Sequence, residues 1–153
     1  MSLLVREALE TCGTLEEVLA CFRARKRTCE YYYVVSDGKT RTAAGLKATP
    51  GALDVIRPGE SHPQLPHPVE DAVLLSAGTR YEELAKRVRE RYGRIDADAL
   101  IAIVDRPVSM KSNLHNVIFE PEDLALRVAN AGRSTPACRQ PYSRSRWEDL
   151  FAP

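Results

Sequence analysis

Residues 31–38 read Tyr31-Tyr32-Tyr33-Val34-Val35-Ser36-Asp37-Gly38, and this stretch decides the fold class. Aromatic and β-branched side chains favour a pleated strand and are poor material for the surface of a helix. The dipeptide Asp37-Gly38 then favours a tight turn. We therefore predict a hairpin whose second arm lies in residues 40–49, followed by a short third strand over residues 52–56.

The segment before the hairpin has the apolar spacing of helices. Residues 3–12 and 15–25 each carry apolar side chains three or four positions apart. Gly13 separates the two patterns, and Thr14 with Glu17 three residues later matches the capping box that begins a new helix. The sequence thus predicts two helices joined by a tight turn.

A proline-rich segment follows the hairpin. Residues 57–70 hold four of the ten prolines of the chain, and each proline lacks a backbone N–H donor. This composition predicts an extended loop rather than a helix or a strand. Residues 72–75 then read as a brief buried strand.

A second group of elements follows that loop. The predicted elements are helices over residues 79–92 and 96–104 and strands over residues 113–119 and 124–130. Thr79 with Glu82 matches another capping box, and Asp96 is a good N-cap for the second helix. The charges of the first helix alternate in sign, which is typical of a solvated face.

The last residues form a C-terminal tail in this prediction. Residues 134–153 contain prolines and a basic run, so we expect them to lie over the surface, anchored by Tyr142, Trp147 and Phe151. Taken together, the elements predict the α+β class and a single domain over residues 1–153.

The charge balance excludes several classes of partner. Lys and Arg number 22 against 21 Asp and Glu, so the formal net charge is +1 and no large field attracts nucleic acid or anionic lipid. No stretch approaches the roughly 20 apolar residues that cross a bilayer. Charged Arg6, Glu7 and Glu10 occupy the place where a signal peptide would be apolar. We expect no nucleic-acid partner, no membrane association and a cytoplasmic location.

Four cysteines are scattered along the chain. Cys12, Cys21, Cys29 and Cys138 include no close pair such as C-x-x-C, so the spacing indicates neither a zinc site nor a redox dithiol. A free cysteine usually packs as a small hydrophobe, and we predict that fate for all four. The sequence indicates no cofactor.

Asn113 and His115 form the most polar functional cluster. Alternate residues of a strand share a face, so these two side chains are expected to point the same way. An amide beside an imidazole can bind an oxyanion or move a proton. The alternative is that His115 is a hydrogen-bonded residue of the sheet, because no nucleophile lies nearby in the sequence.

His62 and His67 lie five positions apart in the proline-rich loop, with acidic residues around them. Such a set can bind a divalent metal in principle. A loop without regular backbone does not preset the geometry of the ligands, so the sequence predicts no metal site here.

Four stretches of the sequence carry a resemblance to a known family. They read Arg27-Thr28-Cys29-Glu30-Tyr31-Tyr32-Tyr33-Val34-Val35-Ser36-Asp37-Gly38, Leu74-Leu75-Ser76-Ala77-Gly78-Thr79-Arg80-Tyr81, Ser112-Asn113-Leu114-His115-Asn116-Val117-Ile118-Phe119-Glu120-Pro121 and Leu126-Arg127-Val128-Ala129-Asn130-Ala131. In this order they resemble the C-terminal half of the isopenicillin-N acyltransferase-like proteins, which are N-terminal-nucleophile hydrolases. The second stretch adds Ser76 as a further candidate site residue.

The resemblance implies a share of an αββα sandwich, in which two antiparallel sheets pack face to face under outer helices. Relatives of this kind cut or transfer amide-linked acyl groups. Their nucleophile is a cysteine that self-cleavage exposes as a new N-terminus, and it lies upstream of the part resembled here. None of the four cysteines occupies its position. Where many relatives carry an Asn-His pair, this sequence has His62 and His67 but no Asn.

Three functions follow as alternatives. The first is the C-terminal portion of an acyltransferase or amide hydrolase, present here as an excised domain or expressed fragment, inactive without the N-terminal half. The second is a stand-alone, non-catalytic module that associates with itself or another chain through an open sheet edge. The third is a small independent hydrolase that uses Asn113, His115 and one cysteine.

Overall fold

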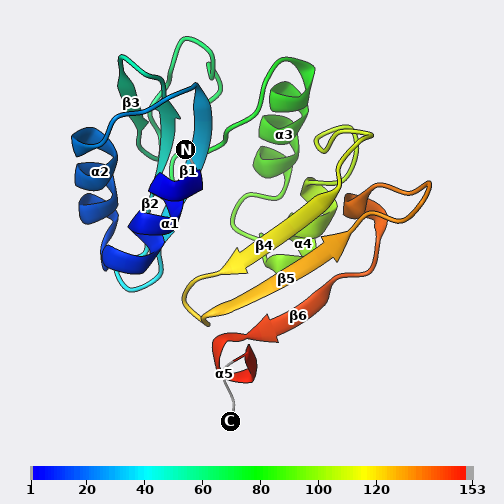
Figure 1. Cartoon of the computed structure of the whole chain (residues 1–153). Coiled ribbons are helices and arrows are strands. Elements are labelled where there is room, and N and C mark those ends of the chain that lie inside the picture. Colours follow the sequence, from blue (N-terminus) through cyan, green and yellow to red (C-terminus); the bar gives the residue numbers. More distant parts are fainter. Residues whose placement is uncertain (1, 151–153) are drawn as a thin grey trace. The chain divides into compact units, whose positions relative to one another are not determined.

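The computed structural model describes residues 2–150, which form helices and two small antiparallel sheets (Figure 1). The predicted α+β class is confirmed. The chain divides into two compact units, Met1–Leu75 and Ser76–Pro153, and each is described by itself. The expectation of a single domain over residues 1–153 stays a prediction. Within the described part of the chain, no helix has the length and apolar character needed to span a membrane.

The first unit contains two helices and one sheet. Its elements are α1 (Ser2–Thr11), α2 (Leu15–Ala24), β1 (Tyr31–Asp37), β2 (Thr42–Ala48) and β3 (Leu53–Ile56). The strands lie in the order β1-β2-β3 and both pairings are antiparallel, with Val34 opposite Gly45 and Gly45 opposite Ile56. The two predicted helices, the hairpin and the short third strand are all confirmed.

The turn between the helices is fixed by the predicted capping box. The Thr14 side chain accepts a hydrogen bond from the Glu17 backbone N–H at 3.3 Å, and the Glu17 carboxylate accepts from the Thr14 N–H at 3.1 Å. The same carboxylate accepts from the Gly13 N–H at 2.6 Å. Three donors at this helix start are thereby satisfied.

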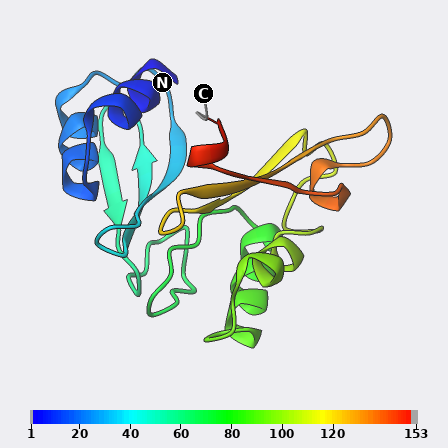
Figure 2. The same cartoon turned by 90° about the horizontal axis from the view of Figure 1, so that it is seen from below.

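The core of the first unit lies between the helices and one face of the sheet (Figure 2). Alternate residues of β2 supply the sheet side of this core, because side chains on a strand alternate between the two faces. The cluster consists of Leu4, Ala8, Leu15, Leu19, Phe22, Ala44, Leu46 and Ala48. Phe22 also contacts Tyr33 of β1 edge to face, with ring centroids 5.4 Å apart.

The opposite face of β2 is covered by the segment predicted as a strand over residues 72–75. That prediction is wrong, because the segment packs by its side chains over Gly45 instead of pairing with a strand edge. A Cβ placed on Gly45 would lie 2.8 Å from Val73 Cγ1 and 3.3 Å from Leu75 Cδ1. Glycine is therefore the residue that permits this close approach.

The proline-rich segment, residues 57–70, contains no helix or strand, as predicted. Two isolated bridges, His62 with Leu65 and Val69 with Ala72, fold it back on itself. Leu65 and Val69 are buried, so apolar anchors hold the loop where backbone regularity does not.

The second unit also contains helices and one sheet. Its elements are α3 (Thr79–Glu90), α4 (Ala97–Ile103), β4 (His115–Glu120), β5 (Ala125–Asn130), the 3-10 turn η1 (Ala137–Arg139), β6 (Ser143–Arg146) and α5 (Trp147–Leu150). The strands lie in the order β4-β5-β6 and are antiparallel. Both predicted helices and the β4-β5 hairpin are confirmed.

The helix starts and the charges of α3 differ in part from the predictions. The Asp96 side chain caps α4 by accepting from the Ala99 N–H at 2.7 Å, as predicted. The second capping box is wrong, because Gly78 is the N-cap of α3 and supplies no side chain. Arg87 is also not simply solvated. Its guanidinium donates to the carbonyls of Ile103 at 3.1 Å and Arg106 at 3.0 Å, and so satisfies the end of α4.

The C-terminal tail contains a strand and a short helix that its composition does not predict. Residues 143–146 pair with β5 as β6, and the Arg144 guanidinium donates to the Glu120 carboxylate at 3.1 and 3.3 Å. The basic run is therefore a strand held by backbone pairing and an acidic partner. Of the predicted anchors, Tyr142 is half-buried, Trp147 is exposed, and Phe151 lies outside the described residues.

The two faces of the second sheet differ. On one face Ile118 and Ala129 are buried, and Arg127 reaches Asp98 of α4 at 2.7 Å, so α4 lies on this side (Figure 2). The other face presents four apolar side chains from two cross-strand pairs, Val117 with Val128 and Phe119 with Leu126. Phe119 is 66% exposed and Val117 36% exposed. We call these four residues the open face.

Candidate functional site

Asn113 has a structural role at the start of β4. Its side-chain N–H donates to the His115 carbonyl at 2.8 Å, and its side-chain oxygen accepts from the Cys138 N–H at 3.0 Å. Its backbone carbonyl accepts from the Ala137 N–H at 2.9 Å. Asn113 thus fastens η1 to the beginning of the strand, and these bonds occupy both ends of the amide that was expected to contact a substrate.

His115 is the first residue of β4 and lies opposite Asn130 on β5. Its ring nitrogen Nδ1 and the Asn130 side-chain oxygen are 2.8 Å apart, so the imidazole is hydrogen-bonded across the sheet. This geometry fits the alternative that His115 is a hydrogen-bonded sheet residue. Asn113 contacts the His115 backbone, not its ring, so the two side chains do not form the expected amide and imidazole pair.

The other candidates do not join this cluster. Ser76 lies in an irregular stretch before α3, and no hydrogen bond links it with Asn113 or His115 among the described residues. His62 belongs to the first unit, where its Nδ1 accepts from the Gln64 N–H at 3.2 Å and its Nε2 lies 3.6 Å from Asp54. No group of three or more His, Cys, Asp or Glu in residues 2–150 is arranged to hold a metal ion.

The cysteines differ in burial. Cys138 is buried, Cys12 and Cys21 are half-buried and Cys29 is exposed. The prediction of buried hydrophobes is confirmed for Cys138 and wrong for Cys29, which lies in the bend between α2 and β1. Burial raises the pKa of the Cys21 thiol, and the neighbouring Cys12 and Glu7 raise this pKa further. An activated nucleophile needs the opposite shift, so Cys21 is a poor candidate for catalysis.

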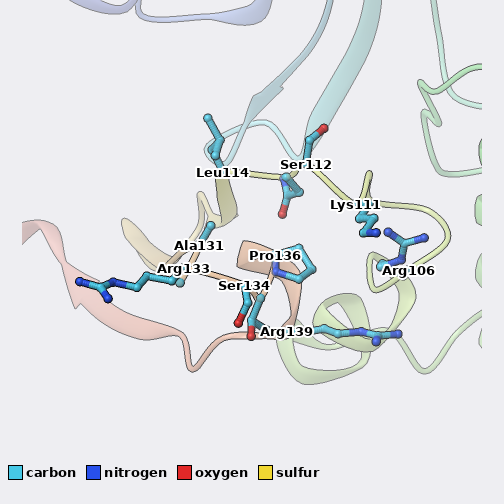
Figure 3. Close-up of a pocket in the computed structure, with 12 residues that line it drawn as sticks. Arg106, Lys111, Ser112, Leu114, Ala131, Arg133, Ser134, Pro136 and Arg139 are labelled. Carbon is cyan, nitrogen blue, oxygen red and sulfur yellow. The ribbon is translucent and has the colours of Figure 1, made fainter.

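A pocket of about 540 Å³ lies in the second unit beside Asn113 (Figure 3). Two loops form it: one precedes β4 and one follows β5. Because His115 at the start of β4 pairs with Asn130 at the end of β5, the loop before β4 and the loop after β5 lie at the same end of the hairpin. Its lining consists of Arg106, Lys111, Ser112, Asn113, Leu114, Ala131, Gly132, Arg133, Ser134, Thr135, Pro136 and Arg139.

The lining has four cationic side chains and no acidic one. Arg139 is neutralised from outside the lining by Asp105, whose carboxylate lies 3.1 Å from the guanidinium. Burial alone would raise the pKa of Asp105, but the Arg106 backbone N–H and the Arg139 side chain lower it below its usual range. Arg106, Lys111 and Arg133 have no acidic partner among the described residues. The pocket therefore presents uncompensated positive charge.

The sequence gives no local signal for this pocket, because its cationic residues are far apart in the chain. Arg106 and Lys111 precede β4, whereas Arg133 and Arg139 follow β5, and a net charge of +1 hides a local surplus. The signal that was available is the hairpin register, since a confident pairing of residues 113–119 with 124–130 brings both loops to one end.

Comparison of the chain with known proteins gave no match among family models, curated proteins or solved structures. The resemblance to the isopenicillin-N acyltransferase-like proteins therefore stays a prediction.

Proposed function

We propose that this chain is a non-catalytic portion of an acyltransferase or amide hydrolase of the N-terminal-nucleophile type, and that it needs a complementary sheet to complete its fold. The observation that supports this proposal is the open face of the second sheet. In an αββα sandwich each sheet has helices on one face and another sheet on the other. A sheet with helices on one side and apolar side chains on the other meets that requirement.

The open face is apolar where an exposed sheet face is usually polar. An antiparallel sheet with one face in water normally alternates apolar and polar residues, and the solvent side carries the polar ones. Here Val117, Phe119, Leu126 and Val128 lie together in the middle of that side, and the polar residues on the same face are His115, Asn130, Ser143 and Ser145. Val117 and Phe119 are the exposed members of this set, so covering them removes apolar surface from water and favours association.

The nucleophile comes from the complementary part in this proposal. The expected nucleophile is a cysteine at a newly exposed N-terminus, with its own α-amine as base. Cys21 has a raised pKa and Cys138 is buried. Neither has the exposure and the lowered pKa of a catalytic thiol.

The test combines this chain with the N-terminal half of an isopenicillin-N acyltransferase-like protein, produced as a separate polypeptide. Complex formation is measured by analytical ultracentrifugation, and amide hydrolysis on a panel of acyl-amino substrates. We expect activity in the mixture and none in this chain alone. Phe119→Asp should prevent the complex, because it places a charge on the open face.

Leu9→Asp is the matched control, because Leu9 is 80% exposed on α1 and lies outside the open face. It should leave the complex and the activity intact. Hydrolysis by this chain alone would contradict the proposal and favour the independent hydrolase. Equal loss with both variants would show that the open face is not the contact.

The second candidate is the non-catalytic module that pairs through a sheet edge. It is favoured by β4, which lies at the edge of its sheet and has neighbours only on the β5 side among the described strands. An unpaired edge offers backbone donors and acceptors to another strand. In the same experiment this candidate predicts a complex without activity that tolerates Phe119→Asp but not a proline at Val117, since Val117→Pro removes a backbone N–H.

A further inference from the structure

We propose that the pocket at the end of the β4-β5 hairpin binds a dianionic phosphoryl group of a small molecule. This site does not depend on acyl transfer and uses no residue of the open face. The observations that carry it are the size of the pocket, the composition of its lining and the position of two cations without acidic partners.

The size fits a small organic ligand. A volume of about 540 Å³ lies within the range of roughly 300–1,000 Å³ that is usual for small-molecule sites. The lining also has an apolar part: Leu114, which is 66% exposed, together with Ala131 and Pro136. A ligand with a short apolar or ring portion attached to a charged group matches both surfaces.

The cationic side chains indicate which charged group of a ligand the pocket would bind. Figure 3 shows Arg106 and Lys111 on the same side of the pocket, with Arg139 extending toward that side, whereas Arg133 extends in the opposite direction. Arg106 and Lys111 therefore place two positive charges on one side of the pocket, and neither has a carboxylate partner among the described residues. A dianion balances both charges at once, and an arginine fork with a lysine point charge is a common combination for phosphate.

Neutral donors complete the lining. Ser112, Ser134 and Thr135 carry hydroxyl groups, and hydroxyl and backbone N–H groups commonly add hydrogen bonds to the oxygens of a bound phosphate. The loop itself is held in shape, because the Gly132 N–H donates to the Thr135 carbonyl at 2.9 Å. Arg87 fixes the other wall by its bond to the Arg106 carbonyl at 3.0 Å.

The test is a titration of the full chain with inorganic phosphate at pH 8, where phosphate is mainly a dianion. Binding is measured by isothermal titration calorimetry and by the NMR chemical shifts of the backbone amides. Acetate at the same ionic strength is the monoanion control. We expect saturable phosphate binding that shifts the amide signals of residues 111–113 and 133–135, and weaker binding of acetate. Phosphate that binds no more tightly than acetate would overturn the proposal.

Two variants with the same change of charge sharpen the test. Lys111→Gln should weaken phosphate binding about tenfold or more, because it removes a direct charged contact. Arg133→Gln should weaken it less than about twofold, since that side chain extends away and contributes only to the long-range field. Arg106→Gln is a second direct variant should Lys111→Gln unfold. Equal weakening by the Lys111 and Arg133 variants would mean a diffuse field rather than a site, and would overturn the proposal.

Discussion

The two units differ in how the faces of their sheets are covered. Each contains a three-stranded antiparallel sheet with helices on one side, α1 and α2 in the first unit and α4 in the second. In the first unit the central strand β2 is covered on both sides, by the helices and by the segment around Val73 and Leu75. In the second unit one face stays open, and the strands are tied together by ion pairs around Glu120.

The two sheets also differ in the size of the side chains that they carry. The first sheet buries small residues, Ala44, Gly45 and Ala48, so that neighbours on both sides approach closely. The second sheet carries larger apolar residues on its open face, where Phe119 is 66% exposed and Val117 is 36% exposed. Because the central strand of the first unit is packed on both faces, we expect the stability of this unit to depend on packing. The stability of the second unit should depend more on charge.

The largest effect is expected from Phe22→Ala in the first unit. Phe22 is only 2% exposed and lies at the centre of the helix-sheet core. Its removal leaves a cavity and should cost about 3–5 kcal/mol. Hydrogen exchange at the amides of β2 measures this loss. Phe119→Ala is the matched control, and because Phe119 is exposed, we expect it to change the protection of β5 by less than about 1 kcal/mol.

Equal loss of protection in β2 and β5 on Phe22→Ala would contradict the separate stability of the two units. That result would show that the two sheets open in one cooperative step, so that packing and charge could not be assigned to separate units.

A smaller effect is expected from Gly45→Ala, which tests the cover on the second face of β2. The new methyl group would meet Val73 Cγ1 at 2.8 Å, so the segment must move or distort, at a cost of about 1–3 kcal/mol. Gly51→Ala is the control, because no atom lies within 4 Å of a Cβ built there. Urea denaturation of both variants measures the difference. Equal stability of the two would mean that residues 73–75 do not press on β2.

How far the sequence predicts this molecule depends on how local the signal is. The capping box at Thr14, the aromatic strand from Tyr31 and the β4-β5 hairpin are set by neighbours in the chain, so their patterns were sufficient. Residues 72–75 look like a strand by composition, but their pairing depends on whether a distant strand has a free edge. The same limit applies to β6, which pairs with β5 and whose Arg144 side chain bonds to Glu120, 24 residues earlier in the chain.

The candidate site shows the limit more sharply. Asn113 and His115 have residue types that can do chemistry, yet backbone and cross-strand hydrogen bonds occupy their side chains. The cations of the pocket gave no motif, since two loops from different parts of the chain supply them. Residue type marks chemistry only where the fold leaves the side chain free, and that is a property of tertiary structure.

The smallest effect is expected from Glu120→Gln, which tests the role of charge in the second unit. Hydrogen bonds from Arg144 and then from Arg127 hold the pKa of Glu120 below its usual value. A carboxyl group whose pKa is lower in the folded state stabilises the fold above its unfolded pKa of about 4.3, and this contribution is lost as pH falls through the folded pKa. Between pH 7 and pH 3 the protection of the β5 amides from hydrogen exchange should therefore fall more in the native chain than in Glu120→Gln.

Glu148→Gln is the control, because its partner Arg146 is half exposed at the end of the sheet and such pairs contribute little to stability. If Glu120→Gln and the native chain lose protection in parallel as the solution is acidified, the ion pairs with Arg127 and Arg144 do not stabilise the sheet, and the second unit relies on its packed face against the helices just as the first unit does.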